Sequence, residues 1–187
     1  MRRSTRASAL LLALCLLLSA CGQRRREPEL NVIDDKYRNW YEVFVYSYYD
    51  SIASLGMNGI WLMPIMPSPS YHKYDVTDYY DIDPQYGTLE DFSALLEKAH
   101  ALGIDVIIDL VLNHTSNEHP WFLSARSGED SEYRNWYNWS DSPQDGYAKA
   151  GEAYYECRFV NTMPDLNLDN PEVRAEIENI LRFWLED

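Results

Sequence analysis

The chain contains three stretches of mainly apolar residues that lack the regular alternation of a half-exposed strand. They cover residues 40–46, 59–65 and 104–112. Near-continuous apolar strands are typical of parallel sheets whose two faces are both covered by helices. The pattern therefore predicts three parallel strands, buried on both faces, in an α/β fold.

A helix is predicted between the second and third of these strands. Thr88 stands three residues before Asp91, which is close to a capping box, and Gly103 follows the helix. The apolar residues recur at spacings of three and four, as an amphipathic helix requires. They are Leu89, Phe92, Leu95, Leu96, Ala99 and Leu102. Strand, helix and strand together form a βαβ unit.

A second helix is predicted from Pro171 to the end of the chain, with Asn170 as its N-cap. Its apolar face comprises Val173, Ile177, Ile180, Leu181 and Trp184.

Residues 113–169 greatly exceed the usual connection of about 2–6 residues, so they are expected to form a small inserted subdomain. Conversely, residues 47–58 leave room for only a stub of helix, because a parallel crossover needs about a dozen residues or more.

The N-terminus has the features of an export signal. Three arginines precede an unbroken apolar run at residues 9–18, which is shorter than the roughly 20 residues of a membrane-spanning helix. Small residues then precede Cys21, which resembles the lipobox of bacterial lipoproteins. We expect residues 1–20 to be a lipoprotein signal peptide and residues 21–36 a tether. The alternative is an ordinary secretory signal with a chance cysteine.

Charge and cysteine content narrow the classes of partner. The formal net charge is −14, which argues against nucleic acid and leaves neutral sugars or cations as partners. Cys15 would leave with the signal and Cys21 would carry lipid, so only Cys157 remains. The sequence therefore predicts neither an intramolecular disulfide nor a cysteine-rich metal site.

Polar and aromatic residues follow the predicted strands, where an α/β barrel places its functional groups. Tyr74 offers a flat apolar face to the C–H face of a sugar, whereas Asp75 and His114 offer hydrogen bonds to hydroxyls. The oxygens of Asn113 and Asp165 suit Ca²⁺. Each residue also has a structural alternative: a tyrosine that packs, a Tyr-Asp pair in a turn, or an Asn-His pair that caps a strand.

Four motifs resemble glycoside hydrolase family 13, the alpha-amylase family. Residues 109–114 read DLVLNH, and residues 163–167 read MPDLN. Residues 72–80, HKYDVTDYY, and residues 86–88, YGT, are also similar to that family. The resemblance implies an incomplete (β/α)8 TIM barrel over residues 37–187, with about the first three β/α units and with residues 113–169 as inserted domain B.

The resemblance also implies roles for individual residues. Tyr74 would stack on the glucose at the −1 subsite, and Asp75 and His114 would bind hydroxyls of that glucose. Asp109 would be structural at the strand end. Asn113 and Asp165 would belong to a calcium site.

The family is a family of retaining alpha-glycosidases, whose nucleophile and acid lie about 5–5.5 Å apart. Both are expected after Asp187, so the resemblance implies a truncated chain that is inactive alone. Residues 47–58 also replace a calcium-binding loop and a full helix of the family.

The expected function is hydrolysis of alpha-glucans or maltooligosaccharides by an exported, membrane-anchored lipoprotein of the bacterial cell envelope. The alternatives are a lipoprotein that binds sugar without cleaving it and a catalytically inactive scaffold.

Overall fold

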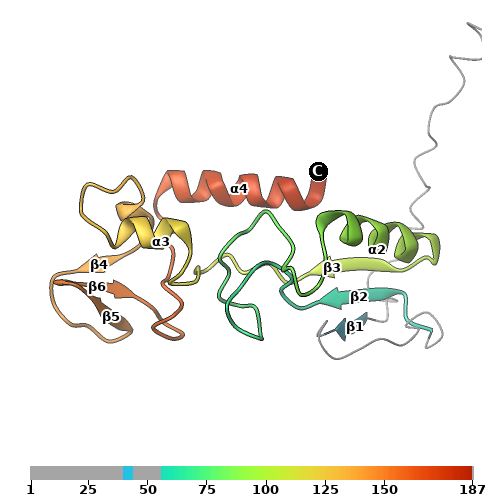
Figure 1. Ribbon diagram of the computed structural model, residues 1–187, viewed down its shortest axis with the longest axis horizontal. Helices are drawn as coiled ribbons and strands as arrows, with labels where there is room; N and C mark the ends of the chain where they lie inside the picture. The colour runs from blue at the N-terminus through green and yellow to red at the C-terminus, as the bar shows by residue number, and fades with distance from the viewer. Residues whose placement is uncertain (1–39, 44–55, 187) are drawn as a thin grey trace, which may run out of the picture. The chain divides into compact units, whose positions relative to one another are not determined.

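The computed structural model describes residues 40–43 and 56–186 (Figure 1). A parallel sheet in the order β1-β2-β3 is formed by β1 (Trp40–Val43), β2 (Gly59–Leu62) and β3 (Asp105–Ile108). The predicted signal peptide, the tether and Cys21 lie outside the described residues, as does most of the short connection between the first two strands.

The predicted βαβ unit is confirmed. Helix α2 (Leu89–Ala101) connects β2 to β3, and the Thr88 side chain accepts a hydrogen bond from the Asp91 amide while the Asp91 side chain accepts one from the Thr88 amide. Both strands are shorter than predicted. Strand β2 ends at Leu62 because Pro64 has no N–H to continue the ladder, and β3 then loses its partner beyond the bond from the Asp109 amide to the Leu62 carbonyl, 2.8 Å.

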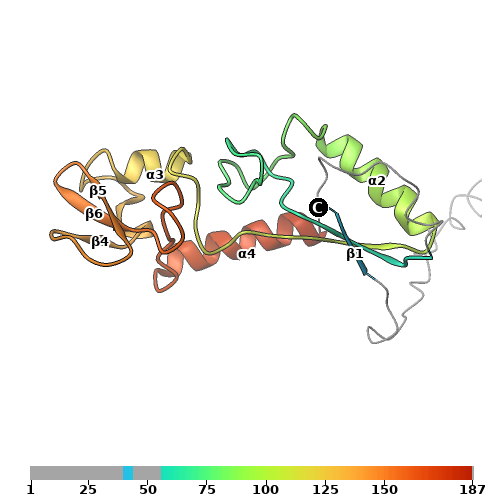
Figure 2. The ribbon, with the colours of Figure 1, turned by 90° about the horizontal axis from the view of Figure 1, so that it is seen from below.

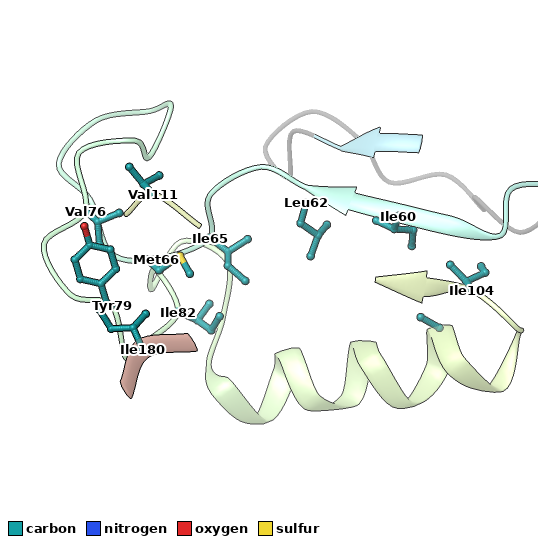
Figure 3. Close-up of a cluster of buried hydrophobic side chains, with 11 residues drawn as sticks. Ile60, Leu62, Ile65, Met66, Val76, Tyr79, Ile82, Ile104, Val111 and Ile180 are labelled. Atoms are coloured by element: carbon teal, nitrogen blue, oxygen red, sulfur yellow. The ribbon is translucent and has the colours of Figure 1, made fainter. Parts of the chain in front are cut away.

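One face of the sheet packs against α2 (Figures 2 and 3). Ile60 and Leu62 point toward this helix, whereas Trp61 points to the other face and is 40% exposed. Its register partner on β3, Ile107, is 43% exposed. The prediction of strands buried on both faces is therefore wrong for the described part of the chain, because no described residue covers this second face fully.

The same hydrophobic cluster extends into the loop between β2 and α2 (Figure 3). Met66, Val76 and Tyr79 from this loop are almost completely buried, and Ile180 from the last helix joins them. The loop between β2 and α2 is therefore packed on the hydrophobic core beyond the end of β2.

The segment between β3 and the last helix has secondary structure of its own. It contains α3 (Pro120–Ala125), the short helix η4 (Arg134–Trp136) and an antiparallel sheet in the order β4-β6-β5. The strands are β4 (Trp139–Ser140), β5 (Tyr147–Ala150) and β6 (Ala153–Glu156). A second hydrophobic cluster lies here, with Phe122, Tyr137 and the buried free Cys157 among its members.

The last helix, α4 (Pro171–Glu186), begins where the sequence predicts. The Asn170 side chain accepts a hydrogen bond from the Glu172 amide at 2.9 Å. Val173 packs in the second cluster and Ile180 in the first, so α4 contributes to both. Leu181, predicted on the apolar face, is 37% exposed and belongs to neither cluster.

Among residues 40–43 and 56–186, no helix has both the length and the apolar character needed to cross a membrane.

Candidate functional site

The loops that follow β2 and β3 meet at one edge of the sheet, because the two strands are parallel neighbours. Tyr74 lies in the first loop and Asp109 follows the end of β3 directly. The Tyr74 hydroxyl donates a hydrogen bond to Asp109 Oδ2 at 2.7 Å. Two residues that the sequence placed at separate strand ends are thus in contact, and this bond holds the tyrosine ring at the sheet edge.

His114 connects the same loop to the inserted segment. Its Nε2 lies 3.0 Å from the Tyr74 carbonyl, and because a carbonyl can only accept, Nε2 carries the proton. Its Nδ1 lies 3.4 Å from the Asn113 side-chain amide, and its own carbonyl accepts from the Tyr79 hydroxyl at 2.7 Å. Burial lowers the pKa of His114, while the Tyr74 carbonyl and the charges of Asp165 and Asp75 raise it less. The imidazole is therefore neutral near pH 7.

Asp75 is a buried carboxylate, 5% exposed, that is oriented by two hydroxyls. Its Oδ1 accepts hydrogen bonds from Ser68 Oγ, at 2.6 Å, and from Ser70 Oγ. His72 Nδ1 lies 3.9 Å from the same oxygen. A buried carboxyl group needs hydrogen-bond partners, and the two serine hydroxyls fix the orientation of Asp75.

Asn113 and Asp165, the two predicted calcium ligands, are in contact. The Asn113 amide donates to Asp165 Oδ1 at 3.2 Å, and the Arg158 backbone amide donates to Asp165 Oδ2 at 3.3 Å. His114 and Asp165 also form an isolated antiparallel bridge. Burial raises the pKa of Asp165. These contacts join the beginning and the end of the inserted segment.

The fit to calcium is partial. Ca²⁺ takes about 6–8 oxygen ligands, and Asn113 and Asp165 supply two side chains. No group of three or more His, Cys, Asp and Glu residues suited to a metal ion occurs in the described part of the chain. The calcium site stays a prediction.

Three residues of this region were not predicted from the sequence. Ser68 and Ser70 stand among prolines, where a serine is expected to make a turn. Nothing in the sequence pattern indicated that their hydroxyls would bond to Asp75. Phe159 is 70% exposed and its ring centroid lies 5.2 Å from that of His114. Its position shortly before the motif at residues 163–167 was the one signal that could have drawn attention to it.

Comparison with known proteins identifies the family. The sequence profile described as "Alpha amylase, catalytic domain" matches residues 45–187. The chain belongs to the alpha-amylase family. The resemblance predicted from the motifs is thereby confirmed, and the relatives of this chain bear names such as alpha-amylase, oligo-1,6-glucosidase and trehalose synthase.

Individual members of the alpha-amylase family cover most of the chain. Alpha-amylase 3 of Dictyoglomus thermophilum is 47% identical over 173 residues, which cover 80% of this chain and 35% of that protein. A probable alpha-glucosidase of Rhizobium meliloti is 45% identical over 152 residues, which cover 72% and 28%. The solved structure of Amy13B from Eubacterium rectale has a TM-score of 0.77 at 50% identity and covers 84% and 36%. The chain thus spans about a third of the length of these relatives.

Proposed function

We propose that this chain supplies the sugar-binding part of the active site of a retaining alpha-glycosidase that acts on alpha-glucans or maltooligosaccharides. The observation that carries the proposal is the network joining Tyr74, Asp109 and His114 where β2 and β3 end. Family membership supports the substrate class, since the relatives include an alpha-amylase and a probable alpha-glucosidase. The substrate is an alpha-linked glucose oligomer, and the expected fold of the active protein is the complete (β/α)8 barrel.

Each side chain of the network has a proposed task. The bond to Asp109 holds the Tyr74 ring so that its face stacks on the C–H face of a glucose unit. The serine hydroxyls occupy Oδ1 of Asp75, and we assign its Oδ2 to hydroxyls of the same glucose. The Nε2 proton of His114 bonds the Tyr74 carbonyl in this structure, and a sugar hydroxyl would share or replace that acceptor. The exposed Phe159 ring beside His114 extends the apolar border of the site.

The carboxylates of this network are assigned to binding and support. Asp75, Asp109 and Asp165 each accept hydrogen bonds from neighbouring groups, which suits acceptors of fixed orientation. We keep the nucleophile and the general acid for residues outside the described part, expected after Asp187. Asn113 and Asp165 would hold Ca²⁺, which would supply structural support there.

A chimaera tests the function. Residues 37–187 replace the matching segment of Dictyoglomus thermophilum alpha-amylase 3, and maltooligosaccharide hydrolysis is measured with calcium present and after chelation. We expect an active chimaera in which Asp75→Asn lowers kcat/KM by about 10²-fold or more, because a charged acceptor for sugar hydroxyls is lost. Asp141→Asn, at an exposed aspartate, is the matched control and is expected to leave kcat/KM unchanged.

The unaltered 187-residue chain provides the second arm of the test. We expect it to bind maltotriose without hydrolysing it, and Asp75→Asn to weaken that binding. Turnover by the chain itself, abolished by Asp75→Asn, would contradict the assignment of the nucleophile elsewhere. A folded but inactive chimaera would favour sugar binding without cleavage, or a scaffold.

A further inference from the structure

Lys73 is a buried cation next to the proposed sugar-binding residues Tyr74 and Asp75. It is 2% exposed, and its Nζ lies 2.7 Å from Oδ2 of Asp83, which is 4% exposed. Its backbone φ is +65°, in the left-handed region that residues with a Cβ rarely adopt. None of these features is explained by sugar binding itself.

Both features cost free energy, so the surrounding structure has to compensate for them. A buried ion pair must recover the loss of hydration of two charges, and a left-handed non-glycine residue is strained. A second hydrogen bond, from Lys73 Nζ to the Ser68 carbonyl at 3.2 Å, compensates for part of this free-energy cost. Lys73 Nζ also lies 5.7 Å from the centre of the Tyr86 ring.

The partners of the pair converge on Ser68. Asp83 Oδ2 accepts from the Ser68 amide at 3.3 Å, while Lys73 donates to the Ser68 carbonyl. The Ser68 hydroxyl in turn donates to Asp75 Oδ1 at 2.6 Å. No helix or strand spans the chain between β2 and α2. Its conformation is held by core packing, by backbone bonds such as that from the Asp83 amide to the Ile65 carbonyl at 2.8 Å, and by side-chain contacts of this kind.

We propose that the buried Lys73–Asp83 ion pair positions the sugar-binding residues, acting on Asp75 through Ser68 and on Tyr74 through the backbone that it adjoins. The inference rests on the proposed function for its consequence in sugar binding. Lys73 and Asp83 are both buried, so we assign them no contact with sugar and treat them as positioning residues. The ion pair holds the loop in one conformation, so that the carboxylate and the ring are placed before a sugar arrives.

The test uses the full chain and the double variant Lys73→Met with Asp83→Asn. This variant removes both charges together, so neither is left buried alone. The introduced carboxamide keeps one acceptor oxygen for the two backbone amides, of Ser68 and Gln85, that donate to Asp83. The first readout is the NMR signal of the His114 Nε2 proton, which donates to the Tyr74 carbonyl. The second readout is the dissociation constant for maltotriose. We expect the His114 signal to be lost or shifted and the affinity to fall by at least about tenfold, while the circular dichroism spectrum is retained.

Two further variants separate positioning from general destabilisation. Thr88→Ala removes the N-cap of α2 and is expected to lower stability while leaving both readouts unchanged. Ser68→Ala keeps both backbone contacts of the ion pair but removes the hydroxyl on Asp75, so affinity should fall while the His114 signal stays. This single variant also decides the route through Ser68 if the double variant does not fold.

The outcomes for the two proposals differ. A wild-type-like His114 signal and affinity in the folded double variant would overturn the positioning role, and full affinity in Ser68→Ala would overturn the route to Asp75. Absence of maltotriose binding by the unaltered chain, together with a lost His114 signal in the double variant, would reject the proposed function and retain the positioning role.

Discussion

Two buried histidines stand close together after β3 and have different tasks. His114 donates to the Tyr74 carbonyl in the candidate site, whereas His119 Nδ1 accepts from the Trp121 amide at 3.1 Å at the start of α3. The His119 ring centroid lies 4.2 Å from that of Trp121 and 5.7 Å from that of Tyr79. Burial lowers the pKa of both histidines, to about 4 for His119. Each is therefore neutral in the folded chain near pH 7.

His119 should make stability depend on pH. In the unfolded chain its pKa is 6.5, so between pH 6.5 and about 4 the unfolded state binds more protons. The free energy of unfolding should fall as the pH is lowered through this window, by about 3 kcal/mol in total. His119→Asn keeps an N-cap acceptor and does not titrate, so urea denaturation at pH 7 and pH 4 should show a smaller difference for this variant. His100→Asn, at an exposed histidine, should behave like the unaltered chain. An equal difference between pH 7 and pH 4 in the unaltered chain and in both variants would contradict the prediction.

At the scale of elements, the helices follow local signals and the strands do not. Helix α2 begins after the Thr88–Asp91 capping box, and α4 begins after Asn170, both as predicted. These contacts join residues only a few positions apart, so the sequence contains all the information. Strand length depends instead on a partner strand, and β3 stops at Ile108 because β2 has turned away at Pro64.

Helix α4 provides a direct comparison of a buried and an exposed apolar residue. Ile180 is 1% exposed in the first hydrophobic cluster, whereas Leu185 is 81% exposed. Ile180→Ala should lower the free energy of unfolding by about 2–5 kcal/mol, because it removes buried methyl groups and leaves a cavity. Leu185→Ala should change it by less than about 0.5 kcal/mol. Urea denaturation followed by circular dichroism measures both, and equal losses would show that α4 does not pack as described.

At the scale of the whole molecule, the two hydrophobic clusters share α4, and one sheet face carries two half-exposed apolar side chains, Trp61 and Ile107. Large apolar side chains side by side on a surface usually mark a contact with another part of a structure. The chain spans about a third of the length of its alpha-amylase relatives. We therefore propose that the remainder of a barrel covers this sheet face in the active protein.

We also propose that the whole molecule is attached to the outer side of a bacterial membrane by lipid on Cys21. The support is the sequence alone: a basic start, an apolar run at residues 9–18, and small residues before the cysteine. In a bacterium that processes lipoproteins, the full chain should partition into the detergent phase of a phase-separation assay. Cys21→Ser should move it to the aqueous phase, whereas Cys15→Ser, within the apolar run, should not. Unchanged partitioning of Cys21→Ser would leave an ordinary secretory signal.

The sequence by itself determined the family, the βαβ unit and the starts of both long helices, because each depends on short motifs or on residues close in the chain. It also placed Tyr74 and His114 at neighbouring strand ends. Their roles toward sugar stay predictions until the variants are measured.

Only the tertiary structure decided which groups meet. The bond from Ser68 to Asp75, the Phe159 ring beside His114, and the exposure of Leu181 all depend on how separate segments pack. A pattern of apolar and polar residues indicates that a side chain is buried or exposed, but it does not specify the partner. The partner is set by the three-dimensional path of the backbone. Along that path the backbone of Lys73 adopts the left-handed conformation, and no local signal in the sequence predicts its ion pair with Asp83.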